Sequence, residues 1–120
     1  MTKKTLVLGA SLKTDRYSNL AIHRLVEHGH EVVAIGLKEG NVSGVAITKE
    51  PIVFKDVDTV TLYLNPRRQS VYYDYIISLH PNRVIFNPGT ENPELYSQLQ
   101  EVGIEVEVAC TLVLLSTNQY

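Results

Sequence analysis

The feature that most constrains the fold is a repeated alternation between short apolar runs and segments with helical spacing. The runs 4–9 and 31–36 are apolar and each ends in a glycine, which is typical of strands buried on both faces. Between them, apolar residues recur at helical spacing from a predicted cap, Ser18, to a terminating residue, Gly29. This strand, helix and strand of about 30 residues predicts a parallel βαβ crossover.

The same alternation continues along the chain. Further strands are predicted at 44–48, 58–64, 83–87 and 104–108. Helices are predicted at 65–80 and 92–103, because each begins with an asparagine cap followed by proline. Residues 49–57 receive no assigned state, and the apolar tail 111–115 is interpreted as a last strand or a docking segment.

The order of these elements predicts an α/β fold. Strands that alternate with helices form a mainly parallel sheet with helices on both faces. The 120 residues suffice for one domain, so a single domain over residues 1–120 is expected. In such sheets ligands bind beyond the carboxyl ends of the strands.

Charge and composition exclude several kinds of partner. The chain has 11 basic and 13 acidic residues, which gives no support to nucleic-acid binding. No apolar stretch approaches the roughly 20 residues needed to span a bilayer. The single cysteine, Cys110, forms no internal disulfide and agrees with a reducing compartment. We therefore expect a cytoplasmic protein that binds neither nucleic acid nor membrane.

The loop after the first strand carries the strongest signal for a binding site. Its candidate residues are Gly9, Ala10, Ser11, Lys13, Arg16 and Ser18. The glycine allows a sharp turn, the small residues let backbone N–H groups approach a ligand, and the helix start favours an anion. Two cations and two hydroxyls suit a pyrophosphate or a phosphomonoester. The alternative to a binding site is an ordinary strand-to-helix loop, in which the lysine and the arginine are exposed on the surface and bind no ligand.

Three other loops are expected at the same edge of the sheet. Gly36 and Leu37 follow the second strand, Asn65 follows the 58–64 strand, and Asn87 ends the 83–87 strand. All four are candidate ligand-binding residues. Asn65 is also explained as a helix cap and Asn87 as part of a turn.

The loop departs from the usual dinucleotide fingerprint. Ser11 and Thr14 replace the second and third glycines of G-x-G-x-x-G, and no acid ends the second strand. Both departures argue against a standard NAD site, but they do not exclude the binding of another adenine nucleotide.

No catalytic constellation is recognisable. The chain lacks G-x-S-x-G, H-E-x-x-H and P-loop lysine motifs. His28 and His30 have no third metal ligand placed near them by sequence, and Cys110 is interpreted as a packed small residue rather than a nucleophile. We therefore expect neither an enzyme nor a metal site.

The segment "LVLGASLKTDRYSNLAIHRLVEHGHEVVAIG" resembles the start of small stand-alone CoA-binding-domain proteins, in which G-A-S precedes a basic residue, a serine, a helix and a G-[HY]-x-V strand. The matching residues are Gly9, Ala10, Ser11, Arg16, Ser18, Gly29, His30 and Val32. Later segments, "VDTVTLYLNP" and "NPELYSQLQEVGIEV", are similar to other family motifs, so the resemblance spans nearly the whole chain.

The resemblance implies a Rossmann-like domain similar to the CoA-binding domain of the succinyl-CoA synthetase alpha subunit. It also implies CoA or acyl-CoA as the ligand, with the phosphates near Gly9, Ser11, Arg16 and Ser18. The leading hypothesis is therefore non-catalytic binding of CoA or an acyl-CoA.

Two other hypotheses stay open. One is an NAD(P)-binding oxidoreductase-type domain. The other is a protein-interaction domain that has lost nucleotide binding, suggested by the tyrosines of one helix, Tyr72, Tyr73 and Tyr75. Because these tyrosines cover more than one helix face, a homodimer is also left open.

Overall fold

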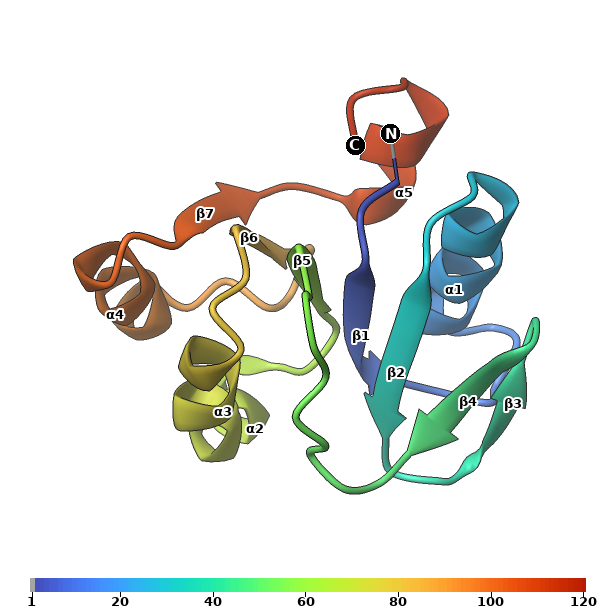
Figure 1. The fold of residues 1–120 in the computed structure, drawn as a ribbon, viewed down its shortest axis with the longest axis horizontal. Coiled ribbons are helices and arrows are strands. Elements are labelled where there is room, and N and C mark those ends of the chain that lie inside the picture. Colours follow the sequence, from blue (N-terminus) through green and yellow to red (C-terminus); the bar gives the residue numbers. More distant parts are fainter. Residues whose placement is uncertain (1) are drawn as a thin grey trace.

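A computed structural model describes residues 2–120. Its centre is one seven-stranded sheet with the order β3-β4-β2-β1-β5-β6-β7 (Figure 1). The strands are β1 (Thr5–Ala10), β2 (Val32–Gly36), β3 (Gly40–Val42), β4 (Val45–Thr48), β5 (Thr59–Leu62), β6 (Arg83–Phe86) and β7 (Glu105–Val108). Neighbouring strands are parallel, except that β3 and β4 form an antiparallel hairpin at one edge.

The central strand is β1, which pairs with β2 on one side and β5 on the other. Leu6, Val7 and Leu8 are fully buried. Leu6 and Leu8 pack into the core on one face of the sheet, and Val7 packs into the core on the opposite face. A strand covered on both faces is apolar at successive positions, which explains the uninterrupted run in the sequence.

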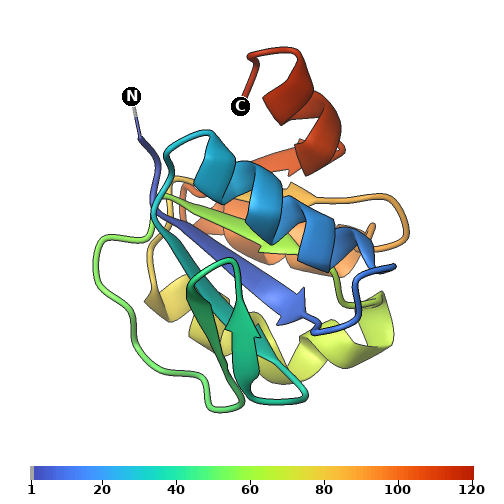
Figure 2. The same cartoon turned by 90° about the vertical axis from the view of Figure 1, so that its right-hand side faces the viewer.

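Helices cover both faces of this sheet. They are α1 (Tyr17–Glu27), α2 (Pro66–Gln69), the 3-10 helix η1 (Ser70–Tyr72), α3 (Tyr73–Ser78), α4 (Pro93–Glu101) and α5 (Thr111–Ser116). Ile22 of α1 and Leu115 of α5 belong to the core on one face, where Figure 2 shows α1 lying across the sheet. Ile76 of α3 and Leu99 of α4 belong to the core on the other face. The predicted α/β class, with a mainly parallel sheet between helical layers, is confirmed.

Two of the three predicted helix caps are confirmed. The Asn65 side chain accepts a hydrogen bond from the Arg68 amide (3.1 Å), and the Asn92 side chain accepts one from the Leu95 amide (3.4 Å). The predicted cap at Ser18 is wrong, because α1 starts earlier and Arg16 occupies the cap position.

Three other elements differ from the prediction. The predicted helix 65–80 is divided into α2, η1 and α3. Of the two alternatives for the tail, the strand is wrong, because the tail forms the helix α5, which packs onto the core through Leu115. Strand β3 was not predicted. It pairs with β4 through a two-residue turn in which Ser43 and Gly44 have φ angles of 53° and 83°, as a type I′ hairpin requires.

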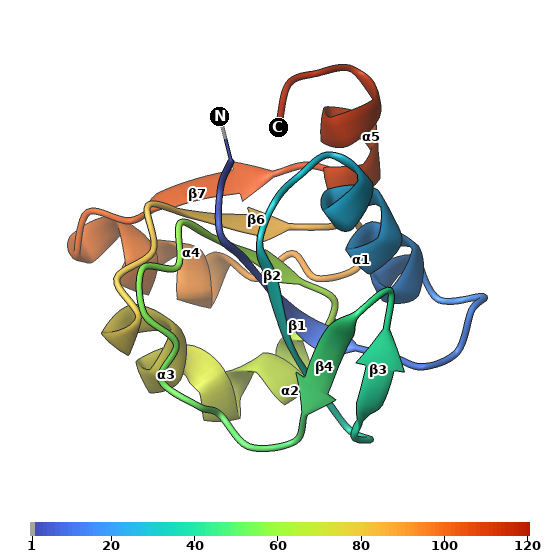
Figure 3. The same cartoon turned by 45° about the vertical axis from the view of Figure 1, so that its right-hand side comes forward.

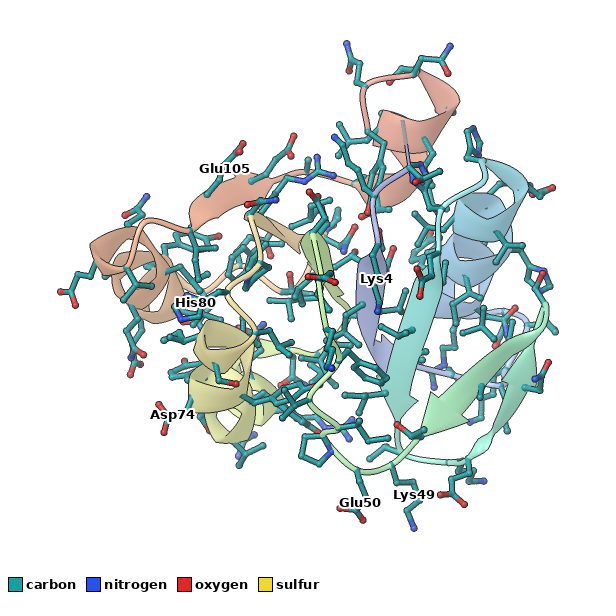
Figure 4. All side chains as sticks on the ribbon, in the orientation of Figure 1. Lys4, Lys49, Glu50, Asp74, His80 and Glu105 are labelled. Atoms are coloured by element: carbon teal, nitrogen blue, oxygen red, sulfur yellow. The ribbon has the colours of Figure 1, made fainter. Side chains whose placement is uncertain are left out.

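The link between β4 and β5 contains no helix. Figure 4 shows Lys49 and Glu50 projecting outward from this link. Its last part packs against the sheet through Val57, which is buried, and Phe54, which is partly buried. The link therefore covers part of the sheet face that a crossover helix covers in a regular βαβ unit.

Residues just before and at the start of β1 contact the last residue, Tyr120, at the amino ends of the parallel strands. The Lys3 ammonium group donates to the Tyr120 carbonyl oxygen (2.5 Å), and the Tyr120 hydroxyl bonds to the Thr5 hydroxyl (2.5 Å). The Arg83 guanidinium lies 4.5 Å from the centre of the Tyr120 ring. These contacts fasten the end of the chain beside the start of β1.

Within residues 2–120, none of the helices combines the length and apolar character needed to cross a lipid bilayer.

Candidate functional site

A cleft of about 940 Å³ lies at the carboxyl ends of the strands, around the end of β1. The chain leaves β1 through α1 toward β2 and leaves β5 through α2 and α3 toward β6, so the strand order reverses between β1 and β5. Figure 3 shows α2 and the end of β1 at this edge of the sheet. Such a reversal point is where open α/β sheets bind ligands.

The cleft brings together most of the predicted site residues. Those that line it are Gly9, Ala10, Ser11, Lys13, Arg16, Ser18, Gly36, Leu37 and Asn65. They come from loops that follow β1, β2 and β5, as parallel strand ends require.

Two glycines allow the backbones around the cleft to approach one another. Gly9 has a φ of +100°, and a Cβ atom there would lie 3.0 Å from the Tyr63 carbonyl carbon. A Cβ atom on Gly36 would lie only 2.2 Å from the Ala10 carbonyl oxygen. At this point, between Leu8 and Ala10, the pairing register of β1 with β2 is shifted. Only residues without side chains fit where the three strand ends converge.

The start of α1 is uncapped and faces the cleft. Arg16 occupies the cap position and makes no side-chain capping bond. The amides of Tyr17 and Ser18 donate to no backbone oxygen within residues 2–120. The loop before them is held by the Asn19 side chain, which donates to the Ser11 carbonyl oxygen (3.0 Å). The helix start therefore offers free N–H groups and a positive dipole end to an anion.

Four cationic side chains line the same cleft: Lys13, Arg16, Lys38 and Arg68. Lys13 and Arg16 were predicted site residues, whereas Lys38 and Arg68 lie in loops expected at this edge of the sheet but were not among the predicted site residues. The ion pairs between side chains of residues 2–120 use other cations, namely Lys4, Arg24 and Arg83. The cleft cations are therefore free to bind an anionic ligand such as a polyphosphate.

The cleft also has an apolar wall, which includes Leu64, Val71, Tyr72 and Pro88; none of these was among the predicted site residues. Val71 lies within the predicted helix 65–80, where a regular helix would place it on the same face as partly buried Tyr75, but it is 80% exposed. The cause is the 3-10 helix η1, which breaks the regular spacing between α2 and α3.

Asn87 is the predicted site residue that does not line the cleft. Its side chain is buried, and its Nδ2 atom donates to the Thr61 hydroxyl (2.7 Å) and the Leu62 carbonyl oxygen (2.9 Å). Its Oδ1 atom accepts from the Thr111 amide (2.9 Å). The asparagine that follows β6 therefore joins β5 to α5 through its side chain, which points into the protein rather than into the cleft.

The other reactive side chains are poorly placed for chemistry in the cleft. Within the described part of the chain, no three His, Cys, Asp or Glu side chains gather as metal ligands would. The Nδ1 atom of His30 accepts from the Lys3 amide (2.9 Å) at the opposite edge of the sheet. Burial raises the pKa of the Tyr63 hydroxyl to about 12, so this hydroxyl stays protonated at neutral pH.

Comparisons with solved structures agree with this architecture. A crystal structure of an uncharacterized protein has 54% identity, covers 100% of this chain and 99% of its own, and superposes with a TM-score of 0.97. A hypothetical protein from Pyrococcus horikoshii OT3 has 28% identity over 93% of this chain and 80% of its own, with a TM-score of 0.83. A structure from Thermus thermophilus has 22% identity, covers 99% of this chain and 91% of its own, and superposes with a TM-score of 0.86. At this identity the likeness shows the fold alone.

The sequence itself identifies the family. Among curated proteins, none matches this chain. A family model described as a CoA binding domain matches residues 3–116, which include every residue that lines the cleft. The chain therefore belongs to the CoA-binding domain family.

Proposed function

We propose that the cleft binds CoA or an acyl-CoA and that the chain is a binding module rather than an enzyme. The observation that carries this proposal is the start of α1, which has no side-chain cap and opens onto a cleft lined by four cationic side chains. CoA carries a pyrophosphate and a phosphorylated ribose, so its charge matches this surface. Membership of the CoA-binding domain family supports the same ligand.

The pyrophosphate would bind at the start of α1. The free amides of Tyr17 and Ser18 would donate to its oxygens, and Lys13 and Arg16 would neutralise its charge. The dipole of α1 adds to this attraction because the helix is long enough to present a positive end.

The phosphorylated ribose would bind at the end of β2. Dinucleotide folds hold a ribose there, with an acid for free hydroxyls or a cation for a phosphate. Lys38 supplies a cation beside Gly36 and Leu37. A cation at this place also suits the 2′-phosphate of NADP, so an NADP-binding domain is the second candidate, whereas NAD is disfavoured.

A thermal-shift panel with CoA, acetyl-CoA, NAD, NADPH and AMP separates these candidates. A ligand that binds the folded state raises the melting temperature, and at 100 times Kd it stabilises by about 2.7 kcal/mol. CoA should give the largest shift. A larger shift with NADPH would favour the second candidate, and no shift with any ligand would favour an interaction domain without a nucleotide.

Replacing Arg16 with alanine should weaken CoA binding about tenfold, because a charge-assisted hydrogen bond to phosphate contributes at least about 1.4 kcal/mol. Arg24→Ala is the matched control. Arg24 lies near the other end of α1, where it pairs with Glu27 (2.7 Å) outside this cleft. Isothermal titration calorimetry measures both affinities. Tight CoA binding that survives in Arg16→Ala would reject the assigned phosphate site.

A further inference from the structure

The two sides of the cleft differ in chemistry. The cationic half, with Lys13, Arg16 and Lys38, lies on the segments after β1 and β2, where Leu12, Tyr17 and Leu37 are also exposed. The apolar half, formed by Leu64, Val71, Tyr72 and Pro88, lies beyond β5 and β6. Arg68 on α2 is the cation on that second side. An occupant that satisfies both halves must be an anion at one end and apolar at the other.

Val71 is the most exposed large apolar side chain of the described residues, at 80%. It lies in η1, which is preceded by the fully buried Gln69 and followed in α3 by the fully buried Ile76. The chain is therefore anchored on both sides of Val71 while this side chain stands in the cleft. Single exposed valines are common on protein surfaces, but Val71 lines a concave site together with half-buried Tyr72 and exposed Pro88.

We propose that the apolar half receives the aliphatic acyl group of an acyl-CoA, so that the protein binds acyl-CoA more tightly than free CoA. This inference rests on the proposed function, because it assumes that the phosphates occupy the cationic half. Free CoA ends in a thiol on a pantetheine arm with two polar amides, and it would leave most of the apolar half exposed to water. An alkyl chain attached to that sulfur would cover it.

The size and charge of the cleft support this occupant. The volume of about 940 Å³ is near the upper end of the roughly 300–1,000 Å³ typical of ligand pockets, which leaves room beside the nucleotide. An apolar side chain of a partner protein would also cover Val71. However, it would leave the cations of the other half without counter-charges, whereas an acyl-CoA matches both halves together.

The test compares the affinities of CoA, acetyl-CoA and octanoyl-CoA by isothermal titration calorimetry. Each fully buried methylene tightens binding about fourfold, so even partial burial of the octanoyl chain should give at least about tenfold tighter binding than acetyl-CoA. In Val71→Ser, the ratio of octanoyl-CoA affinity to CoA affinity should fall at least about threefold. The control Val102→Ser changes a 47% exposed valine outside the cleft, after α4, and should keep the wild-type ratio.

The outcomes separate this inference from the function on which it rests. Equal affinities for CoA and octanoyl-CoA would overturn the acyl site and leave CoA binding intact. An octanoyl preference that Val71→Ser does not reduce, or that Val102→Ser reduces equally, would also overturn it. If none of the three ligands bound, the proposed function itself would fail.

Discussion

Replacing Asn87 with leucine should lower the free energy of unfolding by about 4 kcal/mol. The change removes three buried hydrogen bonds and leaves the Thr111 amide and the Leu62 carbonyl oxygen without this partner. Each buried polar group left unsatisfied costs about 1–3 kcal/mol. Urea denaturation followed by circular dichroism measures the loss as a lower midpoint at an unchanged slope.

Asn82→Leu is the matched control for this substitution. Asn82 precedes β6 and Asn87 follows it, but Asn82 is exposed and bonds only to the Asp58 carboxylate (2.9 Å) through its side chain. Its replacement should cost no more than about 1 kcal/mol. A small effect of Asn87→Leu on stability, together with a large loss of CoA affinity, would restore Asn87 as a ligand-binding residue.

Replacing Gly36 with alanine should destabilise the fold by about 3 kcal/mol. The added Cβ atom would lie 2.2 Å from the Ala10 carbonyl oxygen, and neither β1 nor β2 can move away without breaking the central sheet pairing. A glycine-to-alanine change at an unstrained site usually stabilises by about 0.4–1 kcal/mol through the unfolded state. The backbone clash should therefore reverse the usual sign.

Gly40→Ala tests whether the clash is the cause. Gly40 begins β3, and a Cβ atom there would meet the end of the Leu12 side chain at 2.5 Å. Leu12 is 40% exposed, so its methyl groups can move aside. Urea denaturation should show a change below about 1 kcal/mol for Gly40→Ala. Equal losses in the two variants would contradict the backbone explanation.

The parts of the fold that the sequence predicts are those in which local pattern and burial agree. The strands β1, β2 and β6 are buried between the layers and each contains an uninterrupted apolar run, whereas β5 alternates threonine with apolar residues. The pairs Asn65–Pro66 and Asn92–Pro93 each begin a helix. In each pair the asparagine side chain accepts a hydrogen bond from the first turn, and the proline has no N–H group that would be left unsatisfied there.

The parts that the sequence does not predict depend on contacts distant in the chain. Six residues from Thr111 to Ser116 are too few for periodicity to separate a strand from a helix. Contacts with distant residues hold the start of this segment in place. The Thr111 amide donates to the Asn87 side chain, and the Thr111 hydroxyl bonds to the Thr61 hydroxyl (2.8 Å). Strand β3 has three residues and exists because the turn at Ser43 and Gly44 folds it onto β4.

The same limit applies to the site. The loop from Gly9 to Ser18 is local, so its turn, hydroxyls and cations are readable from one stretch. Lys38 enters the cleft beside the predicted residues Gly36 and Leu37, whereas Val71 enters it from a predicted helix in which nothing in the local sequence marks it as a site residue. Ser18 lines the cleft as predicted, but the helix start is more open to an anion than expected, because Ser18 does not cap it.

The meeting of Lys3 with Tyr120 at the amino ends of the strands has a practical consequence. Both residues lie at the edge of the sheet away from the carboxyl ends of β1 and β5, where the cleft opens (Figure 1). A polypeptide joined at either position would emerge on that far edge. The protein can therefore be fused or tethered to a surface through either point while the mouth of the cleft stays accessible to solvent.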